Sequence, residues 1–178
     1  MTSALKDPLL IAARALIYII LAALGIGAAG IVAAMAVAIF NPSAIISELV
    51  EKVPIEPGSA EVWMMVGVLI LAGIIVGIII LFFVNMLRIV KSVGETDPFV
   101  PVNATRLTSM AWLMLVAQIL SLPTAGLAVA LTNRLGEDPG TVDASLDFGG
   151  IMLILTLFIL ARVFKHGAAM REDLEGTV

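Results

Sequence analysis

Four stretches of this sequence carry no charged side chain, and each consists almost wholly of apolar residues. They cover 15–47, 62–87, 107–133 and 148–161. About 20 consecutive apolar residues form a helix long enough to cross the hydrocarbon core of a membrane. Hydrophobic residues make up 61% of the chain and charged residues only 13%, which is more apolar surface than one water-soluble core buries.

The sequence therefore predicts an all-α membrane protein with a single transmembrane domain over 1–178. The expected architecture is a four-transmembrane-helix bundle in contact with membrane lipid. We place its spans at approximately 13–40, 62–90, 105–132 and 147–168.

Prolines mark the limits of these helices. Asn41-Pro42 ends the first span, because proline disfavours helical geometry in the residue before it. The segment 43–53 alternates apolar and polar residues, so we expect a short interfacial helix after the first span.

Pro123 falls inside the third span and predicts a kink, because the carbonyl one turn earlier lacks an N–H partner.

The fourth span is short. Only 14 residues separate Asp147 from Arg162, which gives about 21 Å at the helical rise. Either Arg162 and Lys165 extend their side chains toward the aqueous phase, or Arg162 is buried against a polar partner. We favour the first arrangement, because it is common for basic residues near helix ends.

Basic residues are distributed unequally between the two ends of the spans. Cytoplasmic segments of membrane proteins carry an excess of Lys and Arg, so the richer side predicts cytoplasmic termini and a cytoplasmic 88–106 connection. The poorer side carries Lys52 and Arg134. The richer side carries eight: Lys6, Arg14, Arg88, Lys91, Arg106, Arg162, Lys165 and Arg171.

Glycine motifs inside the spans favour helix packing. The string Gly25 to Gly30 has the G-x-G-x-x-G spacing of dinucleotide-binding proteins, but no strand precedes it and no βαβ unit surrounds it. Gly73 and Gly77 form a G-x-x-x-G pair on one helix face, where a neighbouring backbone approaches closely. That face serves either packing within the chain or association into a homo-oligomer.

Chemistry-bearing residues are sparse. The chain has no Cys and a single His, His166, so a multi-histidine site and a thiolate metal site are excluded. No Asp, Glu, Lys or Arg lies deep in a span, which weakens an ion-pump or proton-relay interpretation. The sequence thus predicts no enzyme, no cofactor and no metal, and the absence of a basic face predicts no direct contact with nucleic acid.

Two segments on the basic side resemble a known family. They are Gly94 to Phe99, followed by Asn103 and Arg106-Leu107, and the terminal run 161–178. Together they are similar to the bacterial membrane family catalogued as domain of unknown function 2975. Two extra residues separate Gly94 from Asp97-Pro98-Phe99 here. The resemblance implies a bacterial inner-membrane protein without an established enzymatic role, in a family often encoded beside a small helix-turn-helix regulator.

Physical chemistry suggests roles for these residues. Asp97-Pro98 favours a rigid turn, the Phe99 ring can dock under the bundle, and Asn103 has the side chain of a helix cap. Arg106 and Arg162 are expected to pair with Asp97 or with Glu95. A purely structural cap and a docking surface for a partner both fit the pattern.

The leading hypothesis is a non-enzymatic regulator or anchor that binds a cytoplasmic partner, such as a small helix-turn-helix regulator. The alternative is a small transporter, channel or accessory subunit of a larger membrane complex. We call the candidate partner-binding residues the cap: Asp97, Pro98, Phe99, Asn103, Arg106, Arg162, Phe164, Glu172 and Asp173.

Overall fold

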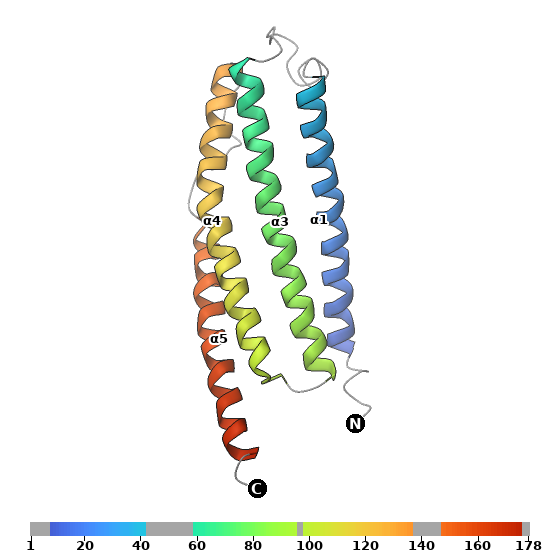
Figure 1. The fold of residues 1–178 in the computed structure, drawn as a ribbon, viewed down its shortest axis with the longest axis vertical. Coiled ribbons are helices and arrows are strands. Elements are labelled where there is room, and N and C mark those ends of the chain that lie inside the picture. Colours follow the sequence, from blue (N-terminus) through green and yellow to red (C-terminus); the bar gives the residue numbers. More distant parts are fainter. Residues whose placement is uncertain (1–7, 42–58, 96–97, 137–146, 176–178) are drawn as a thin grey trace. The chain divides into compact units, whose positions relative to one another are not determined.

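The computed structural model describes residues 8–41, 59–95, 98–136 and 147–175. These residues form four α-helices and no strand: α1 (Pro8–Phe40), α3 (Ala60–Glu95), α4 (Pro101–Leu135) and α5 (Phe148–Glu175) (Figure 1). The expected all-α class and four helices are confirmed. The predicted interfacial helix at 43–53 lies outside the described residues.

Each helix is long and apolar enough to span a membrane. They contain 33, 36, 35 and 28 residues, whereas about 20 suffice for the hydrocarbon core. Three of the predicted spans fall within these helices, and the fourth, 147–168, begins one residue before α5. The largest extension at one end is in α5, which continues for seven residues beyond 168, to Glu175.

Local chemistry accounts for the helix ends. α1 ends at Phe40, directly before Asn41-Pro42, as predicted. The Asp147 carboxylate accepts hydrogen bonds from the backbone N–H groups of Gly149 and Gly150, both at 2.9 Å, and so caps the start of α5. α4 runs through Pro123 as one continuous helix, so that proline does not end it.

Helix segments group into two compact units. Unit 1 comprises 1–23, 78–116 and 147–178, and unit 2 comprises 24–77 and 117–146. Unit 1 therefore takes in parts of α1, α3 and α4 and the whole of α5. Unit 2 takes in the remaining parts of α1, α3 and α4.

Unit 1 has a hydrophobic core where α3, α4 and α5 meet. Two alanines, Ala111 of α4 and Ala161 of α5, are almost completely buried; their small side chains allow the two helices to approach closely. Phenylalanine and methionine side chains fill the space around them. The buried members of this core are Phe82, Leu107, Met110, Ala111, Leu157 and Ala161.

Unit 2 is packed through glycines. The Gly73 position lies against Ile31 of α1, whose Cγ2 would be 3.6 Å from a Cβ placed there. A Cβ at Gly67 would be 3.0 Å from Leu127 Cδ2 of α4. Gly73 thus serves packing within the chain, one of the two alternatives that its motif allowed.

Large apolar side chains cover the outside of the helices. Ile26 is 75% exposed, Phe148 76% and Phe40 86%. Contact with water would cost about 25 cal/mol for each Å² of such surface. Hydrocarbon removes this cost, so the outward faces suit a lipid environment.

Candidate functional site at the junction of α3, α4 and α5

A fully buried amide joins three segments of unit 1. Asn103, with 0% exposure, lies in the first turn of α4. Its Nδ2 donates to the Pro98 carbonyl at 3.0 Å and to Ser92 Oγ at 2.8 Å. The Ser92 hydroxyl in turn donates to the Ile89 carbonyl at 2.8 Å. One side chain therefore ties the end of α3, the connecting turn and the beginning of α4.

Arg106 completes this network. Its Nη1 donates to Asn103 Oδ1 at 2.9 Å and to the Arg88 carbonyl at 3.2 Å. The sequence predicted instead that Arg106 pairs with Asp97 or Glu95. Asp97 lies outside the described residues, as does the side chain of Glu95. The observed acceptors of Arg106 are an amide oxygen and a backbone carbonyl at the end of α3.

Asn103 differs from the helix cap that the sequence suggested. α4 begins at Pro101, so Asn103 is already inside the first turn. Proline is favoured at the first helical position because its missing N–H would have no partner there. With the helix starting two residues earlier, the Asn103 side chain is directed to the preceding turn and to α3 rather than to its own helix end.

An aromatic contact holds the connecting turn against α5. The Phe99 and Phe164 ring centroids are 5.2 Å apart. A Cβ at Gly167 would be only 2.8 Å from Phe99 Cδ1, so the glycine leaves the space that the ring fills. Phe99 nevertheless remains 41% exposed. The docking of this ring, expected from the sequence, is present, with an α5 glycine that the sequence analysis did not single out.

α1 joins unit 1 through Arg14, which the sequence analysis treated only as a topological charge. Its Nη2 donates to the Lys91 carbonyl at 3.4 Å, and the guanidinium lies over Gly94. The Lys91 ammonium lies 5.8 Å from the centroid of the Tyr18 ring. In the sequence, Gly94 was the residue that could have indicated this contact, because a glycine near a helix end has no Cβ and leaves room for a large neighbouring side chain.

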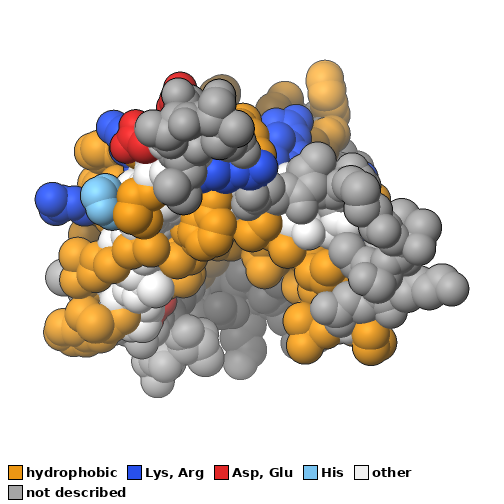
Figure 2. All heavy atoms as spheres, turned by 90° about the horizontal axis from the view of Figure 1, so that it is seen from below, with side chains coloured by type: hydrophobic (Ala, Val, Ile, Leu, Met, Phe, Trp, Pro, Cys, Tyr) orange, Lys and Arg blue, Asp and Glu red, His pale blue; other side chains and the backbone are white. Residues whose placement is uncertain are grey.

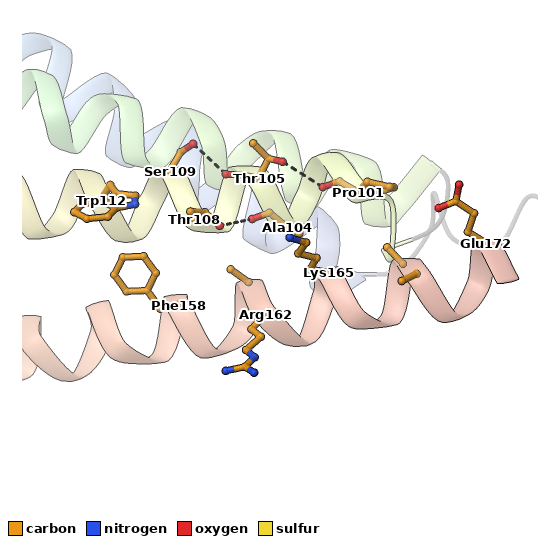
Figure 3. Close-up of a pocket in the computed structure, with 13 residues that line it drawn as sticks. Pro101, Ala104, Thr105, Thr108, Ser109, Trp112, Phe158, Arg162, Lys165 and Glu172 are labelled. Atoms are coloured by element: carbon orange, nitrogen blue, oxygen red, sulfur yellow. Dashed lines mark hydrogen bonds between the residues drawn. The ribbon is translucent and has the colours of Figure 1, made fainter.

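A groove of about 650 Å³ runs between α4 and α5 (Figure 3). Thr105, Thr108 and Ser109 line its α4 wall, and Arg162 and Lys165 belong to its α5 wall. The Lys165 side chain is directed toward α4, whereas that of Arg162 is directed away from it. Trp112, Phe158 and Glu172 also line the groove.

Arg162 is exposed, and no polar partner within the described residues holds it. A buried pair, the second arrangement considered for it, is therefore not the one observed. Glu172 and Asp173 are also exposed, in the last turns of α5, which extend past the beginning of α4 (Figure 1). Figure 2 looks onto this end of the molecule, where basic and acidic side chains lie beside hydrophobic ones.

Most of the cap thus gathers in unit 1. Pro98, Phe99, Asn103, Arg106 and Phe164 are joined by the contacts described above. Among the described residues, no three His, Asp or Glu side chains lie close enough to hold a metal ion.

Four long apolar helices, two of them joined by a hydrogen-bonded polar turn, define a multi-pass membrane protein. Residues 48–178 match the family described as "Protein of unknown function (DUF2975)". The chain therefore belongs to this family, as its loop and terminal motifs predicted. No curated protein and no solved structure matches it significantly.

Proposed function

We propose that this protein is a non-enzymatic regulator or anchor of the bacterial inner membrane that binds a cytoplasmic partner through the cap. The observation that carries this proposal is the fixed yet exposed position of Phe99. Its ring is held by Phe164 and Gly167, and 41% of it remains accessible. Exposed aromatic residues on a rigid support are typical centres of protein interfaces.

The last turns of α5 supply a second part of the proposed surface. Met170 is 52% exposed, and Arg171, Glu172 and Asp173 follow it directly. Methionine adapts its shape to different partners, while charged residues around an apolar centre form the usual rim of an interface. The surface therefore combines two apolar contacts with a polar border.

The placement of helix ends supports a cytoplasmic position for the cap. The start of α1, the end of α3, the start of α4 and the end of α5 all belong to unit 1. Every basic residue of the richer side except Lys6 is in described parts of these segments. The positive-inside rule assigns such an end to the cytoplasm.

The partner class comes from the family resemblance, which implies a neighbouring small helix-turn-helix regulator. Holding such a regulator at the membrane would keep it from DNA without any contact between this chain and nucleic acid.

Co-purification of the adjacently encoded helix-turn-helix regulator with the detergent-solubilised protein tests the proposal. We expect Phe99→Ala to reduce the retained regulator at least about ten-fold, as truncation of a central interface aromatic does. Removal of 170–178 should reduce it similarly. Trp63→Ala is the matched control, because Trp63 is an exposed aromatic of unit 2. Equal retention by wild type, Phe99→Ala and the truncated chain would refute the cap as the docking surface.

An accessory-subunit role is the second candidate, and Gly77 favours it. A Cβ at this position would have no neighbour within 4 Å, whereas the companion Gly73 packs on Ile31. The smooth surface at Gly77 is therefore available to another transmembrane helix, from a second copy or from a larger complex. The native mass of the solubilised protein tests this role, and a monomer would exclude it.

A further inference from the structure

We propose that the groove between α4 and α5 binds the phosphate headgroup of an anionic membrane phospholipid. This site shares Arg162 and Glu172 with the cap but does not include Phe99, and its occupant follows from the polarity of the groove walls. The groove is aromatic at one end, carries the cations Arg162 and Lys165 in its middle part and ends at Glu172. A phospholipid has the same arrangement, with a charged phosphate joined to apolar chains.

Lys165 supplies the positive charge inside the groove. Its side chain is directed from α5 toward α4 (Figure 3), and no hydrogen bond or ion pair within the described residues engages it. Arg162, one turn earlier on α5, stands at the edge of the groove. Each Lys or Arg near the membrane surface contributes about 1 kcal/mol to the attraction of anionic headgroups. Two such cations therefore attract these headgroups strongly.

The hydroxyl groups of the α4 wall refine this assignment. Thr108 donates to the Ala104 carbonyl at 2.9 Å and Ser109 to the Thr105 carbonyl at 3.0 Å. Their protons are thus already used. Thr105 makes a longer contact, 3.5 Å to the Pro101 carbonyl, so its hydroxyl can turn and donate to a phosphate oxygen at little cost. The expected donors to the phosphate are Lys165 and Thr105, whereas Arg162, whose side chain is directed away from α4, adds positive charge at the edge of the groove.

The apolar end of the groove selects a lipid over a soluble anion. The Trp112 and Phe158 rings meet edge to face, with centroids 5.6 Å apart. Phe158 lies within the neutral stretch 148–161, and Lys165 follows it seven positions later in the chain, which is about 10 Å along the helix. The groove therefore extends from the charged end of α5 toward hydrocarbon depth, where an acyl chain would follow the phosphate.

Glu172 limits where the phosphate can lie. This acid also lines the groove, two turns beyond Lys165 toward the end of α5. Like charges repel, so the phosphate is held at the level of Lys165 and Arg162 and not further outward. The position fits a headgroup at the membrane boundary.

Fluorescence quenching by brominated lipids tests the site. The full chain carries two tryptophans, so Trp63→Phe leaves Trp112 as the sole emitter. The protein is reconstituted in vesicles of phosphatidylcholine and phosphatidylglycerol, with bromine on the chains of one lipid at a time. We expect about a five-fold or greater preference of the Trp112 surroundings for phosphatidylglycerol, the factor that one nearby cation contributes.

Substitutions then assign the preference to the groove. Lys165→Gln and Arg162→Gln should each lower it, and the double variant should abolish it. Arg88→Gln removes one charge from an exposed side chain of α3 that does not line the groove, so the preference should persist. Quenching by brominated phosphatidylcholine verifies that Trp112 stays in contact with lipid in every variant.

Three results would overturn the proposal. The preference could survive the double variant, or fall equally in Arg88→Gln, which would indicate a diffuse charge effect. It could also disappear when excess inorganic phosphate is added, which would identify a site for the free anion. Loss of partner binding in Phe99→Ala does not affect this test, because Phe99 is not part of the groove lining.

Discussion

Replacing Asn103 with alanine removes three hydrogen bonds from a site with no access to solvent. They join Asn103 to the Pro98 carbonyl, to Ser92 Oγ and to Arg106 Nη1. A hydrogen bond contributes about 0.5–1.5 kcal/mol net, and more is lost when a buried partner stays unsatisfied. We therefore expect the free energy of unfolding to fall by about 2–4 kcal/mol, since three bonds are lost together.

The assay is unfolding in mixed micelles as the proportion of denaturing detergent is raised. Asn103→Leu keeps the side-chain volume and removes the same bonds, so it should lose a similar amount and thereby exclude a cavity effect. Asn85→Ala is the matched control, because the Asn85 amide donates only within its own helix, to the Leu81 carbonyl at 2.9 Å. Its loss should stay below about 1 kcal/mol. Equal losses in the Asn103 and Asn85 variants would refute the reasoning.

Two further predictions concern topology and helix packing. The chain has no Cys, so Met170→Cys introduces a single site for thiol labelling. A membrane-impermeant maleimide should react with it only after the membrane is permeabilised. Labelling in intact cells would contradict a cytoplasmic cap. Gly73→Leu should reduce stability by about 1–3 kcal/mol through overpacking, whereas Gly77→Leu should leave the monomer unaffected and disrupt any oligomer, as native mass and unfolding in micelles together would show.

The helices were predictable because lipid imposes a simple requirement on sequence. Every backbone polar group must bond internally and nearly every side chain must be apolar over about 20 residues. Charge-free runs therefore located all four helices. They located the helix ends less well, because a charge marks where hydrocarbon ends and not where the helix ends. α5 continues from Arg162 to Glu175 for this reason, since no proline interrupts the sequence there.

The contacts within unit 1 were less accessible to sequence reasoning. The sequence suggested that the Phe99 ring docks under the bundle, but the side of α5 that receives the ring depends on the rotation of that helix. Gly167 was the one residue that could have indicated this side. Several groups were plausible acceptors for the Arg106 guanidinium. One observed acceptor is the Arg88 backbone carbonyl, and the sequence could not indicate it because every residue has a carbonyl. Arg134 was considered in the sequence only as a charge of the poorer side, whereas in the structure it pairs with Glu61 at 3.2 Å and joins α3 and α4 in unit 2.

The physical character of the Asn103 network favours a binding role for the turn that it fixes. A loop that must order itself on binding loses conformational entropy, of about 1–2 kcal/mol for each backbone residue. Here the Pro98 carbonyl is already bonded to Asn103 and the Phe99 ring already rests on Gly167. A partner that contacts Phe99 meets a surface already in its bound conformation, and preorganisation of this kind raises affinity without adding contacts. Stability alone would be served as well by burying the Phe99 ring completely.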